Sequence, residues 1–407
     1  MLKRIFLFFL LCSLFVLPVS GESAPKLMTR QTSAYFGTVS ALFLYDSPDN
    51  TSHFEQTWTQ VKSILDEVER AVSVSMPDSD IARFNALPSG GTMEISAVAA
   101  DVLKLAFAAH QETSGLYDPT VYPLIDLWGF SPRFNTSAYK PLLPYDRIYE
   151  NGQLPLPNAE HIDALLPLIG LTGMQLSEEN GRFYLTKHTP SVTIGDTVIH
   201  AQLDLGGIAK GYACDQVKQL LAEQGYTMGH FICGDSSMAI LSRPDGAYSL
   251  NLGKPRAGSN SASHFATISV RGKTLSTSSD SRHAYIINGV RYCHIIDPRT
   301  GYPINMPSGD VQKGAASITL LSSSAARSDA ITTALCLMSP QEAADFAGTH
   351  LSGDSVIITL YASASDTLEV MHNLDADSIT LSDPAYLAAS EMDAEGSMLY
   401  TGSFFAD

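Results

Sequence analysis

The sequence predicts an α+β fold, and two patterns carry that prediction. Apolar residues recur at helical spacing over residues 54–72, where Val61 and Leu65 share one face, as in an amphipathic helix. Residues 284–296 hold two β-rich runs around Asn288-Gly289, a strong signal for a two-residue hairpin turn. Because strands occur in such pairs as well as between helices, an α+β arrangement is favoured over a doubly wound parallel sheet.

The remaining elements follow from the same periodicities. A strand is predicted over each of residues 34–45, 265–270, 315–321 and 355–360, and a strand pair over 191–205. Helices are predicted over residues 96–111, 159–169, 207–224 and 325–338. Residues 131–156, rich in Pro, Tyr and Asn, are predicted to form a long surface loop. Past Ala362 the sequence is acidic and has no periodicity, which favours a loose tail.

Composition excludes several classes of protein. The chain has 407 residues, 45% of them hydrophobic and 16% charged, so it can bury a large core and is neither disordered nor fibrous. Asp and Glu number 42 against 25 Lys and Arg, which gives a net charge of −17. A chain this acidic is a poor general partner for nucleic acid, and none is expected.

Residues 1–21 have the pattern of a secretory signal peptide. Lys3 and Arg4 precede an apolar run that ends at Pro18, and small residues follow up to Gly21. The run is shorter than the roughly 20 residues of a membrane-spanning helix, so an uncleaved anchor is the less favoured alternative. Cys12 lies within the run without small residues before it, so no lipid anchor is expected. We therefore expect an exported, extracytoplasmic protein.

Four cysteines lie beyond the signal segment, namely Cys214, Cys233, Cys293 and Cys336. They are widely spaced, and no C-x-x-C or zinc-type Cys/His cluster occurs. Buried free thiols are the favoured interpretation, with a single disulfide as the alternative in an export compartment.

The segment Asp204-Leu205-Gly206-Gly207-Ile208-Ala209-Lys210-Gly211 combines a carboxylate at a strand end, a tight glycine turn and a helix start. Backbone N–H groups at a helix start favour anions, and Lys210 lies one turn further on, within reach of a phosphate. The alternative is an ordinary strand–helix turn with a solvated lysine. The segment alone does not decide between the two.

The segment His294-Ile295-Ile296-Asp297-Pro298-Arg299-Thr300-Gly301 follows from the hairpin. A histidine there can act as a base near neutral pH, although a lone strand histidine is more often structural. Arg299 can clamp a phosphate or brace the turn, and Asp297 is expected to form the turn.

Asp329 and Thr333 lie four residues apart and so share one face of the predicted helix over 325–338. A carboxylate and a hydroxyl are hard oxygen ligands of the kind that bind Mg²⁺ beside a substrate phosphate. The alternative has Thr333 bonded back to its own helix and Asp329 in solvent.

Two aromatic residues flank a turn at Ser114-Gly115-Leu116-Tyr117-Asp118-Pro119-Thr120. Tyr117 and the nearby Trp128 can sandwich a planar ring, but an aromatic core beside a turn is the favoured interpretation.

In this order, these motifs resemble the FAD:protein FMN transferase family, the ApbE-like proteins. The resemblance runs from about residue 34 to about residue 360, includes Phe36-Gly37-Thr38 and residues 78–85, and is most specific in the segments starting at Asp204 and His294. The family pattern T-S-G-D-Y is present as Thr277-Ser278-Ser279-Asp280-Ser281, without its Gly and Tyr. This departure bears on flavin packing.

The resemblance implies an α+β core related to the T-fold, with two lobes around an FAD cleft. It implies Mg²⁺-dependent transfer of FMN from FAD to a threonine hydroxyl of an exported or membrane-bound acceptor protein, with release of AMP. One domain is then expected over residues 22–362, followed by a C-terminal extension over 363–407. An FAD pyrophosphatase using the same site, and a secreted flavin-binding protein without catalysis, remain alternatives.

The resemblance also implies residue roles. The catalytic groups correspond to His294, as general base, and Lys210. The FAD contacts correspond to Phe36, Leu116, Tyr117, Asp118, Asp204, Lys210, Ile296 and Thr332. The metal ligands correspond to the Gly207 carbonyl, Asp329 and Thr333.

Overall fold

The computed structural model describes residues 24–131, 156–256, 264–281, 283–288, 290–306, 315–361, 368–382 and 388–389. Helices and antiparallel strands are mixed along the chain, so the predicted α+β class is confirmed. The predicted signal segment 1–21 and most of the predicted loop over 131–156 lie outside the described residues.

A nine-stranded sheet forms the centre of the molecule, in the order β1-β2-β8-β9-β12-β16-β17-β18-β20. Its strands are β1 (Lys26–Tyr35), β2 (Thr38–Asp46), β8 (Gly229–Cys233), β9 (Ser237–Ile240), β12 (Thr274–Ser279), β16 (Ser317–Ser322), β17 (Ser355–Tyr361), β18 (Leu368–His372) and β20 (Ala388–Ala389). All neighbouring pairs are antiparallel except β18 and β20. The β16 side chains are buried throughout, because both faces of the sheet are covered.

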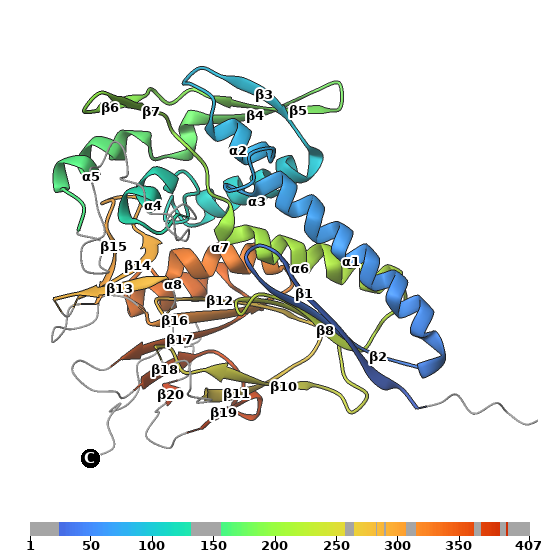
Figure 1. Cartoon of the computed structure of the whole chain (residues 1–407). Helices are drawn as coiled ribbons and strands as arrows, with labels where there is room; N and C mark the ends of the chain where they lie inside the picture. The colour runs from blue at the N-terminus through green and yellow to red at the C-terminus, as the bar shows by residue number, and fades with distance from the viewer. Residues whose placement is uncertain are drawn as a thin grey trace, which may run out of the picture.

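Helices α6 (Gly206–Glu223) and α7 (Ala325–Leu335) cover one face of this sheet, and α1 (Thr51–Val72) packs beside them (Figure 1). On the opposite side lies a small sheet of β10 (Tyr248–Gly253), β11 (His264–Val270) and β19 (Ile379–Leu381). Its side chains form one apolar cluster with residues of β12 and β18, including Phe265, Leu275 and Val370. Helix α7 is buried along almost its whole length, whereas the C-terminal part of α6 reaches the surface.

A second layer lies on the far side of α6 and α7 (Figure 1). Its helices are α2 (Asp80–Asn85), α3 (Ala97–Glu112), α4 (Tyr122–Trp128) and α5 (Ala159–Leu165). Its strands are β3 (Thr92–Ile95), β5 (Arg182–Lys187) and β4 (Met174–Glu179) in one sheet, and the hairpin β6 (Val192–Ile194) and β7 (Thr197–Ile199). The sheet β13 (Ala284–Ile287), β14 (Val290–Ile296) and β15 (Pro303–Met306) and helix α8 (Pro340–His350) complete the described fold, apart from short 3₁₀ turns.

Most predicted elements are confirmed because their signals are local. α3 begins after Ser96, whose side chain accepts a hydrogen bond from the N–H of Ala99, as its capping role requires. α6 is followed by Gly225 at φ +80°, a conformation that glycine adopts without strain. Asn288 turns the β13–β14 hairpin at φ +51°.

Two predictions are wrong. The single strand expected over residues 34–45 is a hairpin of β1 and β2 that turns at Phe36 and Gly37, both with positive φ. The expectation of a loose tail past Ala362 fails for residues 368–382, because β18 pairs with β17 inside the central sheet and β19 pairs with β11. The extension thus supplies core strands, and residues 390–407 lie outside the described residues.

The four cysteines beyond the signal segment are buried and free, as the favoured interpretation predicted. Within the described ranges, no helix is both long and apolar enough to cross a membrane.

Lys187 is a fully buried lysine at the end of β5. Its Nζ donates to the carbonyls of Phe84 (3.2 Å) and Leu87 (2.9 Å), where α2 ends, and lies 4.8 Å from the centre of the Phe84 ring. Burial lowers the pKa of Lys187 from its ordinary value of 10.5 to about 8. The ammonium takes the place of water at backbone carbonyls of the α2 C-terminus that have no partner within the helix.

This burial predicts a pH-dependent difference between the wild type and Lys187→Met. Between about pH 8 and pH 10.5 the unfolded chain holds a proton that the folded chain has lost, so this group makes stability rise with pH. The wild type should therefore gain roughly 2 kcal/mol over Lys187→Met between pH 7.5 and pH 10. Urea unfolding at both pH values measures this difference, with Lys104→Met, on the exposed face of α3, as the control. Parallel pH profiles for the wild type and Lys187→Met would contradict the prediction.

Candidate active site

Three segments meet at the start of α6: the turn at residues 116–120, residues 203–205 directly before the helix, and helix α7. Because β7 ends at Ile199, Asp204 does not lie at a strand end as the sequence predicted. The N–H of Asp204 donates to the carbonyl of Pro119 at 2.8 Å. The side-chain amide of Asn85 bonds both the carbonyl and the N–H of Leu203, at 2.8 and 2.7 Å. These bonds hold Asp204 beside the turn that contains Tyr117 and Asp118.

The first turn of α6 is built without side chains at Gly206 and Gly207. Asp204 Oδ1 accepts from the N–H of Gly206 at 2.7 Å, and Lys210 Nζ donates to the carbonyl of Gly206 at 2.9 Å. A Cβ added at Gly207 would lie 3.4 Å from the Tyr117 ring and 3.7 Å from Thr333 Oγ1. The glycine motif therefore brings the backbone of α6 directly against Tyr117 and Thr333.

Helix α7 lies against α6 at Gly211. A Cβ at Gly211 would lie 2.2 Å from the carbonyl oxygen of Ala325, so only glycine permits this approach. Asp215, one turn along α6, accepts from the N–H groups of Ala325 and Ala326 at 2.7 and 3.0 Å and so caps α7. The two helices are therefore joined by close packing and by a buried cap.

Asp329 faces α6 from α7. It is 3% exposed, its Oδ2 accepts from the N–H of Gly211 at 3.2 Å, and Oδ2 lies 3.9 Å from Lys210 Nζ. In an α-helix the N–H of Gly211 points to the carbonyl oxygen of Gly207. Because Asp329 Oδ2 accepts from the same N–H, it lies on the side of the helix where that carbonyl oxygen is found. The alternative of a solvent-exposed Asp329 is wrong.

Two threonine hydroxyls of α7 converge on Ser278 at the end of β12. Ser278 Oγ lies 2.9 Å from Thr332 Oγ1 and 3.2 Å from Thr333 Oγ1. Thr333 Oγ1 also donates to the carbonyl of Asp329 at 3.1 Å, so the back-bonded alternative for Thr333 is confirmed. A hydroxyl used as donor in this way keeps its oxygen lone pairs available to a cation.

Charges at the site influence one another because water is largely excluded. Burial acts to lower the pKa of Lys210, but the nearby carboxylates, Asp329 first, outweigh it, so the pKa is raised. Burial raises the pKa of Asp204, against the opposing effects of the Gly206 N–H and Lys210. The alternative of a solvated lysine is wrong, since the Lys210 side chain is 25% exposed and hydrogen-bonded. A charged lysine among carboxylates is the result.

The turn at residues 116–120 is rigid and mostly buried. Asp118 Oδ1 accepts from both the N–H and the hydroxyl of Thr120, at 2.8 and 2.6 Å, and burial raises the pKa of Asp118 in spite of these bonds. Leu116 packs against two core clusters, that of α6 and that of β14 and α7. Tyr117 is buried.

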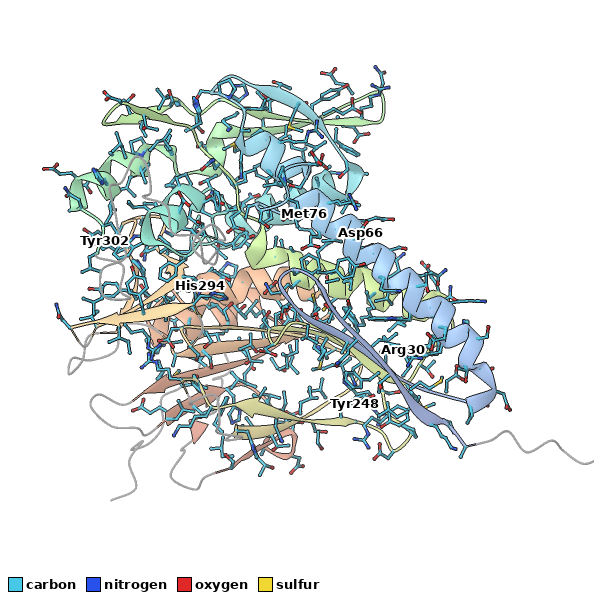
Figure 2. The ribbon with its side chains drawn as sticks, in the orientation of Figure 1. Arg30, Asp66, Met76, Tyr248, His294 and Tyr302 are labelled. Atoms are coloured by element: carbon cyan, nitrogen blue, oxygen red, sulfur yellow. The ribbon has the colours of Figure 1, made fainter. Side chains whose placement is uncertain are left out.

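β14 carries His294 and Ile296. Its alternate residues Cys293 and Ile295 join the apolar cluster of α7, which leaves half-buried His294 on the opposite face of the strand (Figure 2). The His294 ring meets that of His283 edge to face, with centroids 5.5 Å apart. Ile296 is buried at the strand end.

The side chains of Asp297 and Arg299 bond each other across the following turn, at 2.7 to 3.2 Å. Arg299 thus braces the turn. Asp297 forms the turn, because its Oδ1 also accepts a hydrogen bond from the backbone N–H of Arg299. This outcome agrees with the structural alternative for Arg299.

Trp128 belongs to the core, as the favoured interpretation of the aromatic segment predicted. Its Nε1 donates to the carbonyl of Gly301 at 2.7 Å, and its ring stacks on Tyr292. Phe36 lies on the β1–β2 turn, where its N–H donates to Glu69 of α1 at 2.8 Å.

The arrangement suits a small, hard cation. The Gly207 backbone and the Thr333 hydroxyl are neighbours, and Asp329 supplies a carboxylate close by. A carbonyl, a hydroxyl and a carboxylate match the oxygen preference of Mg²⁺. Within the described ranges no group of three or more His, Cys, Asp or Glu side chains is placed to hold a metal ion, and the predicted ligand set contains only one such residue.

The model of the ApbE family matches residues 36–358. This chain belongs to the ApbE family. The resemblance found in the sequence motifs is thereby confirmed.

Curated ApbE relatives match along most of their length. A protein of Klebsiella pneumoniae (strain 342), named FAD:protein FMN transferase, is 25% identical over 333 residues, which are 82% of this chain and 84% of that protein. A Haemophilus influenzae protein of the same name is 29% identical over 314 residues, 76% of this chain and 81% of its own.

Solved ApbE structures share the fold. The apo form of the Pseudomonas stutzeri flavinyl transferase ApbE matches with a TM-score of 0.65 at 24% identity, over 84% of this chain and 93% of its own. The Vibrio cholerae flavin transferase ApbE matches with a TM-score of 0.64 at 22% identity, over 85% of this chain and 97% of that structure. The architecture is therefore that of ApbE proteins.

Sequence reasoning missed three groups at this site. Ser278 contacts two threonines, Gly211 donates to Asp329, and Asp215 caps α7. Ser278 and Gly211 lie in segments that the sequence analysis had singled out, the one starting at Thr277 and the one starting at Asp204, whereas Asp215 lies in neither.

The α6–α7 contact predicts that Gly211→Ala is strongly destabilising. The new methyl would overlap the Ala325 carbonyl, so the helices must separate, at a cost of about 3 kcal/mol. Chemical denaturation measures the change. Gly253→Ala, where a Cβ meets nothing within 4 Å, is the control and should stay within about 0.5 kcal/mol of the wild type. Equal stability of the two variants would refute close packing at Gly211.

Proposed function

We propose that this chain is an FAD:protein FMN transferase that moves FMN from FAD to a threonine hydroxyl of a target protein and releases AMP. The observation that carries the proposal is the meeting of Gly207, Lys210 and Thr333 around the buried Asp329 at the start of α6, in a chain of the ApbE family. The names of the curated relatives support the reaction.

The proposed reaction exchanges the phosphoanhydride bond of FAD for a phosphoester bond to the threonine. The threonine oxygen forms a bond to the phosphorus of the FMN half, and the bond between that same phosphorus and the bridging oxygen of the pyrophosphate breaks, so the bridging oxygen leaves as part of AMP. His294 takes the threonine proton, and the bond electrons leave with AMP. Lys210 balances the charge that develops on the pyrophosphate, because its raised pKa keeps it protonated.

The residues present fit Mg²⁺ at this site. The Gly207 carbonyl, Asp329 and Thr333 would hold the ion, and Lys210 lies beside them. When bound, Mg²⁺ supplies charge neutralisation at the pyrophosphate. Asp329, Thr333 and Ser278 keep the oxygen ligands in place through their mutual contacts.

FAD would lie along the three segments that meet at α6. In this proposal it contacts Phe36, Leu116, Tyr117, Asp118, Asp204, Lys210, Ile296 and Thr332. The cleft that would hold FAD is the one between two lobes that the family resemblance implies.

The acceptor is proposed to be an exported or membrane-bound protein. The signal-like segment 1–21 supports an extracytoplasmic location for the enzyme.

Product analysis tests the function. The chain without residues 1–21 is incubated with FAD, Mg²⁺ and a candidate acceptor carrying a threonine among small residues. AMP together with the FMN mass increment on the acceptor supports transfer. AMP with free FMN and no labelled acceptor supports an FAD pyrophosphatase instead, and bound FAD without AMP supports a flavin-binding protein.

Asp329→Asn should lower the rate of transfer by at least about 100-fold, because it removes the one carboxylate of the proposed cation site while keeping an oxygen that accepts from Gly211. The rate is measured as AMP release over a Mg²⁺ titration. A variant with wild-type rate and wild-type Mg²⁺ dependence would exclude Asp329 as a ligand.

His294→Gln should bind FAD normally and transfer FMN about 100-fold or more slowly, because only the base is removed. FAD affinity and AMP release are measured side by side. His283→Gln, which changes the ring beside it, is the matched control and should keep transfer within a few-fold of wild type. Loss of FAD binding in His294→Gln would give His294 a structural role.

A further inference from the structure

Arg327, in the first turn of α7, joins three parts of the fold. Its Nε donates to Glu112 Oε2 at 3.1 Å, and its Nη2 donates to Oε1 of the same carboxylate. Its Nη1 donates to Asp354 Oδ2 at 2.8 Å, and Nη2 also donates to the carbonyl of His350 at 3.0 Å. One half-buried guanidinium therefore links α7 to the last residue of α3 and to the connection between α8 and β17.

The ion pair of Arg327 and Glu112 has the geometry of the stronger kind. Two parallel N–H···O bonds to one carboxylate fix the orientation of both side chains as well as their separation. The side chains are 30% and 24% exposed, so water and salt screen this pair less than they screen an ion pair on the open surface. Because the two residues lie 215 positions apart in the sequence, the pair fixes the end of α3 against the start of α7.

The turn at residues 116–120 is fastened to the end of α3. The N–H of Tyr117 donates to Thr113 Oγ1 at 3.0 Å, and the Thr113 hydroxyl donates to the carbonyl of Ala109 at 2.7 Å. These bonds reach back into the last turn of α3. A shift of Glu112, at the end of that helix, therefore carries the turn with it.

Three contacts then connect α3, α6 and α7 around the candidate site. The turn after α3 is bonded to the start of α6 through Asp204, and α6 is packed against α7 at Gly211. The third contact, from α7 back to α3, is the pair of Arg327 and Glu112. Asp329, two residues after Arg327, faces α6 between these contacts. The third contact therefore helps to set the separation between Asp329 and the turn.

We propose that the pair of Arg327 and Glu112 is a positioning contact, which holds the turn at residues 116–120 and helix α7 at the separation that bound FAD requires. The inference rests on the proposed function, which places FAD along the turn and Mg²⁺ at Asp329. Neither Arg327 nor Glu112 touches a substrate in this proposal. The two residues prepare the geometry of the site before FAD binds.

Glu112→Ala and Asp354→Ala are matched variants that test the proposal. Each removes one carboxylate partner of Arg327, but Glu112 ends α3, whereas Asp354 precedes β17. With Mg²⁺ present, the dissociation constant for FAD should rise about 10-fold in Glu112→Ala and stay within about 2-fold of wild type in Asp354→Ala. Calorimetric titration measures both constants, and chemical denaturation measures the stability of each variant.

The double variant and the rate at saturating FAD separate positioning from a structural role. Arg327→Met should weaken FAD binding as much as Glu112→Ala does, and the double variant should weaken it no further, because each change already opens the same contact. AMP release at saturating FAD should stay within about 3-fold of wild type, since bound FAD itself spans the turn and α7 and restores their separation.

Three results would overturn the proposal. These are wild-type FAD affinity in Glu112→Ala, an equal loss of affinity in Glu112→Ala and Asp354→Ala, which marks a general loosening around Arg327, and additive losses in the double variant. Failure of the transferase proposal is seen separately, as wild-type protein that binds FAD but releases no AMP. The affinities of the two matched variants for FAD would then still decide on the positioning contact.

Discussion

The close approach of α6 and α7 at Gly211 is the constraint on which the site depends. Because Gly211 has no side chain, the Ala325 backbone comes near enough for Asp215 to cap α7 and for Asp329 to accept the Gly211 N–H. Those bonds bring together two motifs more than 100 residues apart in the sequence. The lysine, the carboxylate and the threonine of the candidate site take their positions from this single helix contact.

Local physical signals explain what the sequence predicted well. Helical periodicity, the Ser96 cap and the Asn288 turn each act within a few residues, and each element is present where its signal lies. The free thiols follow from the same reasoning, since an apolar setting and wide spacing favour burial over pairing. The fold class and most helix bounds were therefore within reach of sequence reasoning.

Non-local structure explains what was missed. The turn between β1 and β2 places Phe36 at a positive φ, which is unusual for a non-glycine residue. The sequence there does not match the common turn patterns, so the hairpin was not predicted. β18 forms a strand because it pairs with β17. The acidic composition past Ala362 gave no sign of this pairing, so the strand could not be predicted from it. The partners of Ser278 and Gly211 lie on α7, so their roles became visible only when the helices were placed together.

Helix α7 is buried at every residue except the half-buried Arg327 and Thr333. Its interior polar groups bond within the helix or to its neighbours, as Ser328 and Thr332 do through carbonyls one turn earlier. A helix enclosed in this way has no surface position at which substitutions accumulate harmlessly. We therefore expect α7 to tolerate few substitutions other than exchanges among small residues, although no amphipathic pattern in its sequence marks it as important.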